Sequence, residues 1–135
     1  LIDLYGKNFS KGNTIYINYN HNFDNIHKNL KNEKVDVIFL IAVIEHMERP
    51  DLVIRKSRKF LSQDGKFIIT APSIYSKPVL EFLAFKLGFI NRVLIEEHKR
   101  YYNKKQYVKL AKMTKCNLLK FKFFMLGMNT LAILT

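Results

Sequence analysis

The main evidence for the fold class is the stretch at residues 35–41, Val-Asp-Val-Ile-Phe-Leu-Ile. Their apolar side chains follow one another with little alternation, which is typical of a parallel strand buried on both faces. Pro50 suits the first turn of a helix, and we expect that helix to run to about Leu61. Asp64-Gly65 predicts a turn, and Lys-Phe-Ile-Ile-Thr-Ala at 66–71 predicts a second strand. Together these segments predict a βαβ unit with two parallel strands.

Further elements are expected on both sides of this unit. Upstream, β-branched and aromatic residues predict a short strand at 14–17, and apolar spacing predicts a helix at 22–33. Downstream, we expect helices at 78–90 and 104–115, the second with Tyr107, Val108, Ala111 and Met113 among its apolar positions. Residues 119–125 and 128–134, joined by a turn at Leu126-Gly127, predict a β-hairpin. The predicted fold is α/β, with a doubly wound, mostly parallel sheet and a C-terminal antiparallel hairpin.

The composition narrows the class of protein. Apolar residues make up 48% of the 135-residue chain, which is enough to bury a core. The first 50 residues hold six basic and six acidic side chains, so the net charge of +12 arises after Pro50. A basic half can attract nucleic acid, an anionic membrane or a phosphorylated substrate. The lysines are scattered, however, which favours a solvated surface and no specific nucleic acid.

The single cysteine, Cys116, excludes an internal disulfide framework and a cysteine-rich zinc site. No segment near residue 1 has the pattern of a secretion signal. A reducing, cytoplasmic location is therefore expected.

Several motifs occur in a fixed order along the chain. Asp36-Val37-Ile38 is followed by Val43-Ile44-Glu45-His46 and Pro50, and then by the Asp64-Gly65 turn and the strand that ends at Pro72. Residues 98–102, His-Lys-Arg-Tyr-Tyr, precede the last helix. This order resembles the class I S-adenosylmethionine-dependent methyltransferases, from their fourth strand to their final hairpin. Within that family it most resembles ubiquinone-biosynthesis O-methyltransferases and methyltransferases of sugars or cell-surface precursors.

The sequence departs from this family at the cofactor loop. The family holds S-adenosylmethionine on a Gly-x-Gly-x-Gly loop after its first strand, where the backbone must approach the ligand closely. The chain has five glycines, and the closest pair is Gly6 and Gly12. Residues 1–4 resemble the end of the family's second strand. We therefore expect residues 1–135 to form a partial, N-terminally truncated, Rossmann-like methyltransferase domain that lacks the first strand and the glycine loop.

The resemblance assigns two residues to the cofactor. Asp3 occupies the place of the family's acidic residue after strand two, which accepts hydrogen bonds from the ribose hydroxyls. The alternative for Asp3 is an ordinary solvated aspartate. Ile41, at the end of the predicted strand, occupies a position that touches the cofactor in the family and can also serve as core packing.

Glu45 and His46 are the candidate catalytic pair, since they follow a strand end that would face the ligand crevice. His46 would act as a general base on an acceptor hydroxyl, because histidine titrates near neutrality. The alternative is structural, with Glu45 capping the next helix or pairing with a lysine. Some relatives bind a divalent metal through Glu-x-x-Glu-His. Ala42 replaces the first glutamate here and the four histidines are dispersed, so no metal is predicted.

The segment at 98–102 resembles the family's substrate side. His98 would bind or deprotonate the acceptor, and Arg100 would hold a phosphate or carboxylate group. The alternative for both is a surface loop of a basic protein. Residues 78–90 are unusually apolar for a connection between strands, which favours a lid helix packed on the sheet and leaves contact with an anionic membrane surface as the alternative.

Three functions follow from these observations. The first is methyl transfer from S-adenosylmethionine to a small acceptor such as a sugar, a quinone or a cell-surface precursor. The second is an inactive, methyltransferase-like interaction module, which the missing glycine loop favours. The third is a nucleic-acid-binding module, which only the net charge of +12 suggests.

Overall fold

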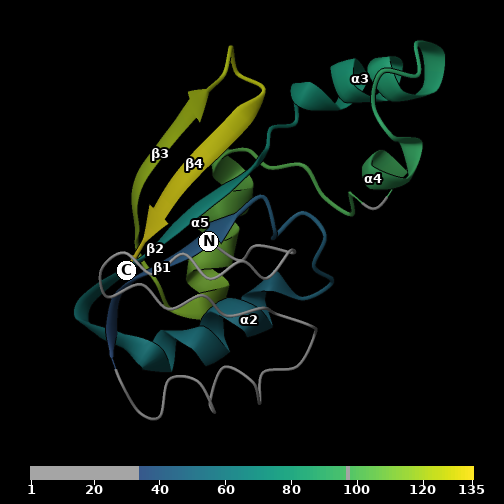
Figure 1. The fold of residues 1–135 in the computed structure, drawn as a ribbon. Helices are drawn as coiled ribbons and strands as arrows, with labels where there is room; N and C mark the ends of the chain where they lie inside the picture. The colour runs from purple at the N-terminus through teal and green to yellow at the C-terminus, as the bar shows by residue number, and fades with distance from the viewer. Residues whose placement is uncertain (1–33, 97) are drawn as a thin grey trace, which may run out of the picture.

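The computed structural model describes residues 34–96 and 98–135. Asp3, the strand expected at 14–17 and the helix expected at 22–33 lie outside these described residues. The described part forms a small α/β domain built on one mixed, four-stranded sheet (Figure 1). The strands are β1 (Val35–Ile41), β2 (Leu61–Pro72), β3 (Leu118–Phe124) and β4 (Asn129–Leu134), in the spatial order β1-β2-β4-β3.

The βαβ unit is confirmed. β1 and β2 pair in parallel, with Phe39 opposite Ile68 and Ile41 opposite Thr70. The register of this pair shifts between Val35 and Val37, and the Asp64-Gly65 turn expected from the sequence falls in the matching irregular part of β2. There is no room for a side chain at Gly65, since a Cβ atom would lie 2.8 Å from Cβ of Leu61.

The C-terminal hairpin is also confirmed. β3 and β4 are antiparallel, and β4 lies antiparallel to β2 as well, with Thr70 opposite Leu131. Among the described strands, β1–β2 is therefore the only parallel pair, whereas a mostly parallel sheet was expected. The tip of the hairpin turns tightly, because Met125, Leu126 and Gly127 all have positive φ angles.

Two helices complete the core. α2 (Pro50–Ser57) begins at the predicted proline and continues as a 3₁₀ turn, Arg58–Phe60. α5 (Lys104–Thr114) begins with a reciprocal capping box, in which Asn103 and Gln106 each bond the other's backbone N–H group. α2 and α5 lie against each other beside the sheet (Figure 1).

The buried face of α5 differs from the prediction at two positions. Tyr107 and Ala111 are buried as expected, but Val108 and Met113 are exposed, and Leu110 and Thr114 are buried instead. Tyr107 is fully buried, packs against the ring of Tyr102 at a centroid distance of 5.1 Å and bonds the Thr130 hydroxyl at 3.1 Å. These contacts join α5 to β4.

The connection between β2 and α5 does not form the single helix expected at 78–90. α3 (Ser76–Glu81) begins earlier, continues as a π-helical turn (Phe82–Lys86) and ends before Gly88, whose φ is +67°. A short helix, α4 (Arg92–Glu96), follows. We call residues 76–96 the arm, because they stand away from the sheet rather than lying on it (Figure 1).

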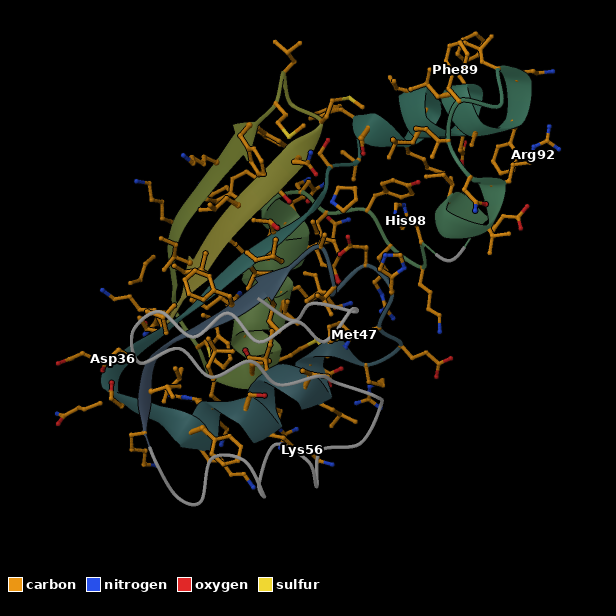
Figure 2. The ribbon with its side chains drawn as sticks, viewed as in Figure 1. Asp36, Met47, Lys56, Phe89, Arg92 and His98 are labelled. Carbon is orange, nitrogen blue, oxygen red and sulfur yellow. The ribbon has the colours of Figure 1, made fainter. Side chains whose placement is uncertain are left out.

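The arm exposes several large apolar side chains. Phe89, labelled near Arg92 in Figure 2, is 78% exposed. The others are Val79, Phe82, Phe85, Leu87 and Val93. The expectation of a single lid helix packed on the sheet is therefore wrong for the described arm. No helix among the described residues is both long and apolar enough to cross a bilayer.

Candidate active site

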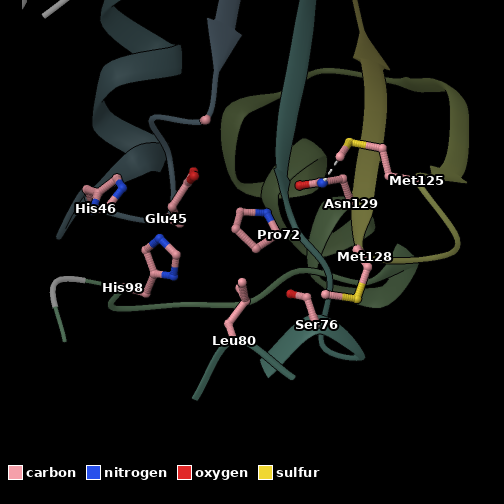
Figure 3. A pocket seen from close by; sticks show the side chains of 10 residues that line it. Glu45, His46, Pro72, Ser76, Leu80, His98, Met125, Met128 and Asn129 are labelled. Atoms are coloured by element: carbon pink, nitrogen blue, oxygen red, sulfur yellow. Dashed lines mark hydrogen bonds between the residues drawn. The ribbon is translucent and has the colours of Figure 1, made fainter. Parts of the chain in front are cut away.

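A pocket of about 420 Å³ opens where β1 and β2 end (Figure 3). This is the carboxyl edge of the parallel pair, where open α/β sheets bind their ligands. Segments far apart in the sequence contribute to it: the turn after β1, the end of β2, the start of the arm, the segment before α5 and the tip of the hairpin. The lining residues are Ala42, Glu45, His46, Pro72, Ser76, Leu80, His98, Met125, Met128 and Asn129.

Local backbone geometry places Glu45 and His46 in this pocket. Ala42 has a φ of +50°, which ends β1 and turns the chain across the sheet edge. The N–H of Ala42 still donates to the carbonyl of Thr70 at 3.1 Å, so the turn stays attached to β2. The N–H of His46 then donates to the carbonyl of Val43 at 3.1 Å. The predicted pair therefore lies in a short, bonded turn.

His98 comes to the same place from a distant part of the chain. Its ring centroid lies 4.8 Å from that of His46, with the rings tilted by 57°. The backbone N–H of the next residue, Lys99, donates to the carbonyl of Glu45 at 2.9 Å, which attaches this segment to the turn. His98 Nδ1 lies 3.4 Å from the Tyr101 hydroxyl, close enough for a weak hydrogen bond. The three predicted catalytic residues thus form one cluster.

Glu45 is the most buried member of the cluster. It is 1% exposed, and its Oε2 atom has no hydrogen-bond partner among the described residues. Burial raises the pKa of this carboxyl group to about 7, and a backbone hydrogen bond opposes part of that rise. Glu45 therefore changes its protonation state near neutral pH, as an acid or base in catalysis must do.

The same three residues could hold a cation. One ligand atom from each of Glu45, His46 and His98 lies within 4.8 Å of the others. Ligands of a tetrahedral zinc ion at bond lengths of about 2.0–2.2 Å lie roughly 3.5 Å apart, so the cluster would have to contract to bind one. No metal was expected from the sequence, because Ala42 replaces a glutamate of the family motif and the four histidines are dispersed along the chain; the fold nevertheless brings His46 and His98 together.

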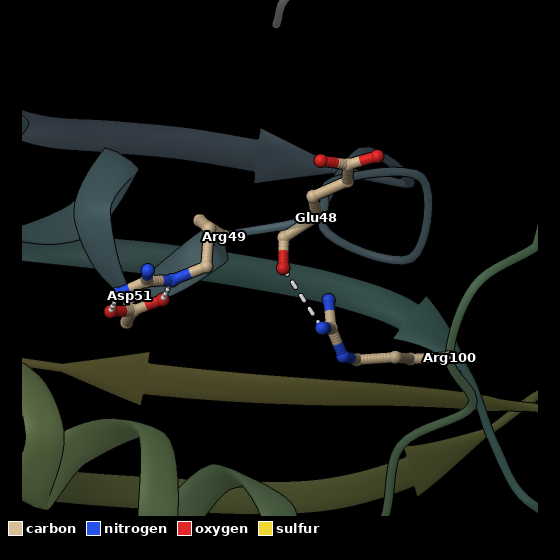
Figure 4. Close-up of polar contacts among 4 residues, drawn as sticks. All are labelled: Glu48, Arg49, Asp51 and Arg100. Atoms are coloured by element: carbon tan, nitrogen blue, oxygen red, sulfur yellow. Dashed lines mark hydrogen bonds and ion pairs between the residues drawn. The ribbon is translucent and has the colours of Figure 1, made fainter.

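Arg100 does not line the pocket; its guanidinium group binds backbone. Its Nη1 donates to the carbonyl of Met47 at 2.6 Å. Its Nη2 donates to the carbonyl of Glu48 at 2.8 Å, the bond that Figure 4 shows. Arg49 bonds both carboxylate oxygens of Asp51 in the same region, at 3.0 and 2.9 Å. This pair lowers the pKa of Asp51 and fixes the first turn of α2. Phosphate or carboxylate binding by Arg100 remains a prediction that this placement does not support.

We expect Arg100→Ala to lower the free energy of unfolding by about 1 kcal/mol, because two charge-assisted bonds to the turn are lost at a partly exposed site. The affinity for acceptor should change little. Denaturant unfolding of Arg100→Ala checks the first expectation, and Arg55→Ala, at an exposed position of α2, is the matched control. If Arg100→Ala left the stability unchanged and lowered the affinity for the acceptor, the ligand-binding role of Arg100 would be supported instead.

Of the two predicted cofactor residues, only Ile41 belongs to the part of the chain that the structure describes. Ile41 is half-buried at the end of β1 and lies outside the lining, and Asp3 lies outside the described residues. Other lining residues were not anticipated. Pro72 could have been predicted as a lining residue from the sequence, because it ends the strand that pairs with β1. Met125, Met128 and Asn129 carry no comparable signal, since their position depends on the geometry of the hairpin tip.

Comparison with known proteins relates the first half of the chain to methyltransferases. Residues 6–69 match a family model described as a methyltransferase domain. This match includes β1, α2, most of β2 and the Glu45-His46 turn. No curated protein sequence matches the chain.

Solved structures with the same fold include three of interest. OxaC in complex with sinefungin and meleagrin superposes with a TM-score of 0.56 at 10% identity, over 76% of this chain and 26% of OxaC. LepI in complex with SAM superposes with a TM-score of 0.55 at 8% identity, over 76% of this chain and 26% of LepI. A Nostoc punctiforme protein assigned as an O-methyltransferase superposes with a TM-score of 0.53 at 14% identity. The superposition covers 76% of this chain and 32% of that protein.

The chain thus spans between about a quarter and a third of the length of these structures. At such identities the likeness concerns the fold, and the family match concerns residues 6–69. The family match includes the βαβ unit that carries Glu45 and His46 except for the end of β2. Residues 6–69 are therefore similar to a methyltransferase domain, and the described sheet shares its fold with these solved structures.

Proposed function

We propose that the chain provides the acceptor side of a methyltransferase that transfers a methyl group to a hydroxyl of a small molecule. The observation that carries this proposal is the convergence of Glu45, His46 and His98 in one pocket at the carboxyl edge of β1 and β2. Such an edge is where this class of sheet binds ligands, and the cluster supplies groups able to accept a proton there.

The described residues fit the acceptor better than the cofactor. They form no glycine-rich cradle at the end of a strand, and the proposed ribose ligand, Asp3, lies outside them. When bound, S-adenosylmethionine supplies an electrophilic methyl group on a positively charged sulfur. A pocket that contains Glu45 and no lysine or arginine among its described lining residues suits such a cation.

The residues of the pocket would act mainly by alignment. The walls hold the acceptor so that its oxygen faces the methyl carbon, which is the largest contribution a protein can make to a direct displacement. His46 takes the hydroxyl proton as the new carbon–oxygen bond forms. His98 holds the acceptor oxygen from the other side, and the Glu45 carboxyl beneath them stabilises the positive charge that His46 acquires.

Cofactor titration by calorimetry tests whether the chain, proposed to provide the acceptor side, holds the cofactor only weakly. We expect the 135-residue chain to bind S-adenosylmethionine weakly or not at all, and Asp3→Ala to weaken whatever binding is seen. Tight, stoichiometric binding that Asp3→Ala leaves unchanged would contradict the assignment of the cofactor residues. Binding of the cofactor without methyl transfer to any acceptor would favour the inactive interaction module.

Catalysis is proposed to need no metal, since Ala42 stands where relatives have a further carboxylate. Turnover should then be the same before and after dialysis against a chelator. Turnover that is lost on chelation and restored by zinc would show that Glu45, His46 and His98 hold an ion in the working enzyme. His98→Gln would then abolish the restoration.

A further inference from the structure

The pocket has one polar end and otherwise mostly apolar walls. Glu45, His46 and His98 gather at one end, as Figure 3 shows, and the remaining lining is mostly apolar, with Ser76 and Asn129 as its polar residues. A ligand that fills the pocket would therefore meet hydrogen-bonding groups mainly at a single end. The apolar wall residues are Ala42, Pro72, Leu80, Met125 and Met128.

The other two polar residues of the lining already have partners. The Ser76 hydroxyl donates to the carbonyl of Ser73 at 2.7 Å, within the first turn of α3. The Asn129 amide nitrogen lies 3.4 Å from the sulfur of Met125, which holds it against the hairpin tip. The Ser76 donor is therefore used within α3, whereas the side-chain oxygen of Asn129 can still meet a ligand at the hairpin tip. Glu45, His46 and His98 together form the main polar end of the pocket.

The described lining of the pocket carries no permanent positive charge, although the chain has a net charge of +12. None of the lysine and arginine residues that the structure describes belongs to its lining. The nearest candidates are engaged elsewhere: Arg100 binds two backbone carbonyls, and Lys99 pairs with Glu48 at 2.9 Å. A phosphate or carboxylate in the pocket would meet Glu45 without a compensating cation, which is unfavourable in a partly buried site.

We infer that the acceptor is an uncharged, largely apolar molecule that carries its methyl-accepting hydroxyl at one end, such as a phenol on a fused ring. This inference rests on the proposed methyl transfer and names its substrate class. The pocket volume of about 420 Å³ is in the range of small-molecule sites. Met125 and Met128 suit the faces and edges of an aromatic ring, because thioethers are polarisable and adapt their shape.

Sugars and phosphorylated precursors fit this pocket poorly. Each additional hydroxyl group that is buried without a partner costs about 1–3 kcal/mol, and a charged group costs more. Among the three acceptor types considered from the sequence, the walls therefore favour a quinol-like ring over a sugar or a charged cell-surface precursor.

Fluorescence titration of the full chain with 2-naphthol tests this inference, with 2-naphthyl phosphate and glucose as matched comparisons. The phosphate has the same apolar body and differs by its charge, whereas glucose lacks the apolar body. We expect naphthol to bind at least about tenfold more tightly than naphthyl phosphate, and glucose not to bind. Equal or tighter binding of the phosphate, or binding of glucose, would overturn the inference.

A charged substitution on the apolar wall tests whether naphthol binds in this pocket. Met128→Lys should weaken naphthol binding at least about tenfold and reduce the preference over naphthyl phosphate, since it supplies the missing cation. Met113→Lys is the control, because Met113 is exposed on α5 and lies outside the pocket. Unchanged naphthol binding in Met128→Lys would place the ligand elsewhere and overturn the inference.

These binding measurements need no cofactor, so they separate the inference from the proposed function. Methylation of a sugar or a phosphorylated hydroxyl by an active preparation would overturn the acceptor class and leave the proposed methyl transfer standing. A preference for naphthol in a preparation that methylates no acceptor would instead overturn the proposed function.

Discussion

In a preparation that transfers methyl groups, replacing His46 with alanine is expected to lower turnover about 10²–10⁴-fold while leaving cofactor affinity nearly unchanged, as loss of a general base does. His46 lies in the turn after β1, beside His98 and at the polar end of the pocket. The acceptor hydroxyl should therefore meet it directly. The far ribose end of the cofactor is assigned to Asp3, so the two functions should separate.

Rate measurements and cofactor titrations on the same preparations check this expectation. Asp3→Ala should show the reverse effect, with weaker cofactor binding and a smaller loss of turnover at saturation. Lys105→Ala, at an exposed position of α5 outside the pocket lining, controls for nonspecific effects of an alanine substitution. Full turnover in His46→Ala would mean that the Glu45-His46 pair is structural, and His98 would become the leading candidate for the base.

The strands could be predicted from the sequence because local pattern decides them. The apolar run of β1 predicts a strand, and the parallel pairing with β2 follows from the helix between them. The expected burial on both faces is wrong, because Val37 and Phe39 are exposed and Leu40 is the buried residue of β1. The hairpin was predictable for the same reason, since its turn at Leu126-Gly127 separates two segments rich in apolar residues. In each case the information lies within a few neighbouring residues.

The arm and the buried face of α5 depend on tertiary contacts instead. Residues 78–90 are apolar enough for one helix, but the chain turns at Gly88 and leaves Phe89 exposed. Val108 and Met113 have apolar side chains that sequence reasoning placed in the core. The sheet instead contacts the face that carries Tyr107, Leu110 and Thr114.

The candidate site was predictable only in part. Glu45 and His46 follow a strand end, which is a local signal, whereas the place of His98 beside them came from the family resemblance. The role expected for Arg100 illustrates the limit. Its residue type suits an anion, but the structure directs it to the carbonyls of Met47 and Glu48, which sequence spacing does not reveal.

Glu45 should make the stability of the cofactor-free chain depend on pH. Burial raises the pKa of its carboxyl group from 4.5 to about 7, so the folded chain retains this proton at pH values where the unfolded chain has released it. The resulting stabilisation is fully present below about pH 4.5 and is lost as the pH rises to about 7. A shift of this size corresponds to about 3 kcal/mol of unfolding free energy.

Glu45→Gln is expected to remove this contribution, because glutamine cannot ionise. Relative to the unchanged chain, the variant should gain about 3 kcal/mol in unfolding free energy between pH 4 and pH 8. Urea unfolding at a series of pH values in the presence of a chelator measures the difference. Each comparison is made between the two chains at one pH, so that ionisations common to both chains do not affect the difference.

Glu96→Gln is the matched control for this measurement. Glu96 is an exposed carboxylate on α4, so its loss should leave the pH dependence of unfolding unchanged. If Glu45→Gln and the unchanged chain instead lost stability in parallel from pH 4 to pH 8, Glu45 would be ionised in the folded state throughout. The carboxylate would then have a compensating partner, and its role would be to orient His46 and His98 by charge rather than to exchange a proton with them.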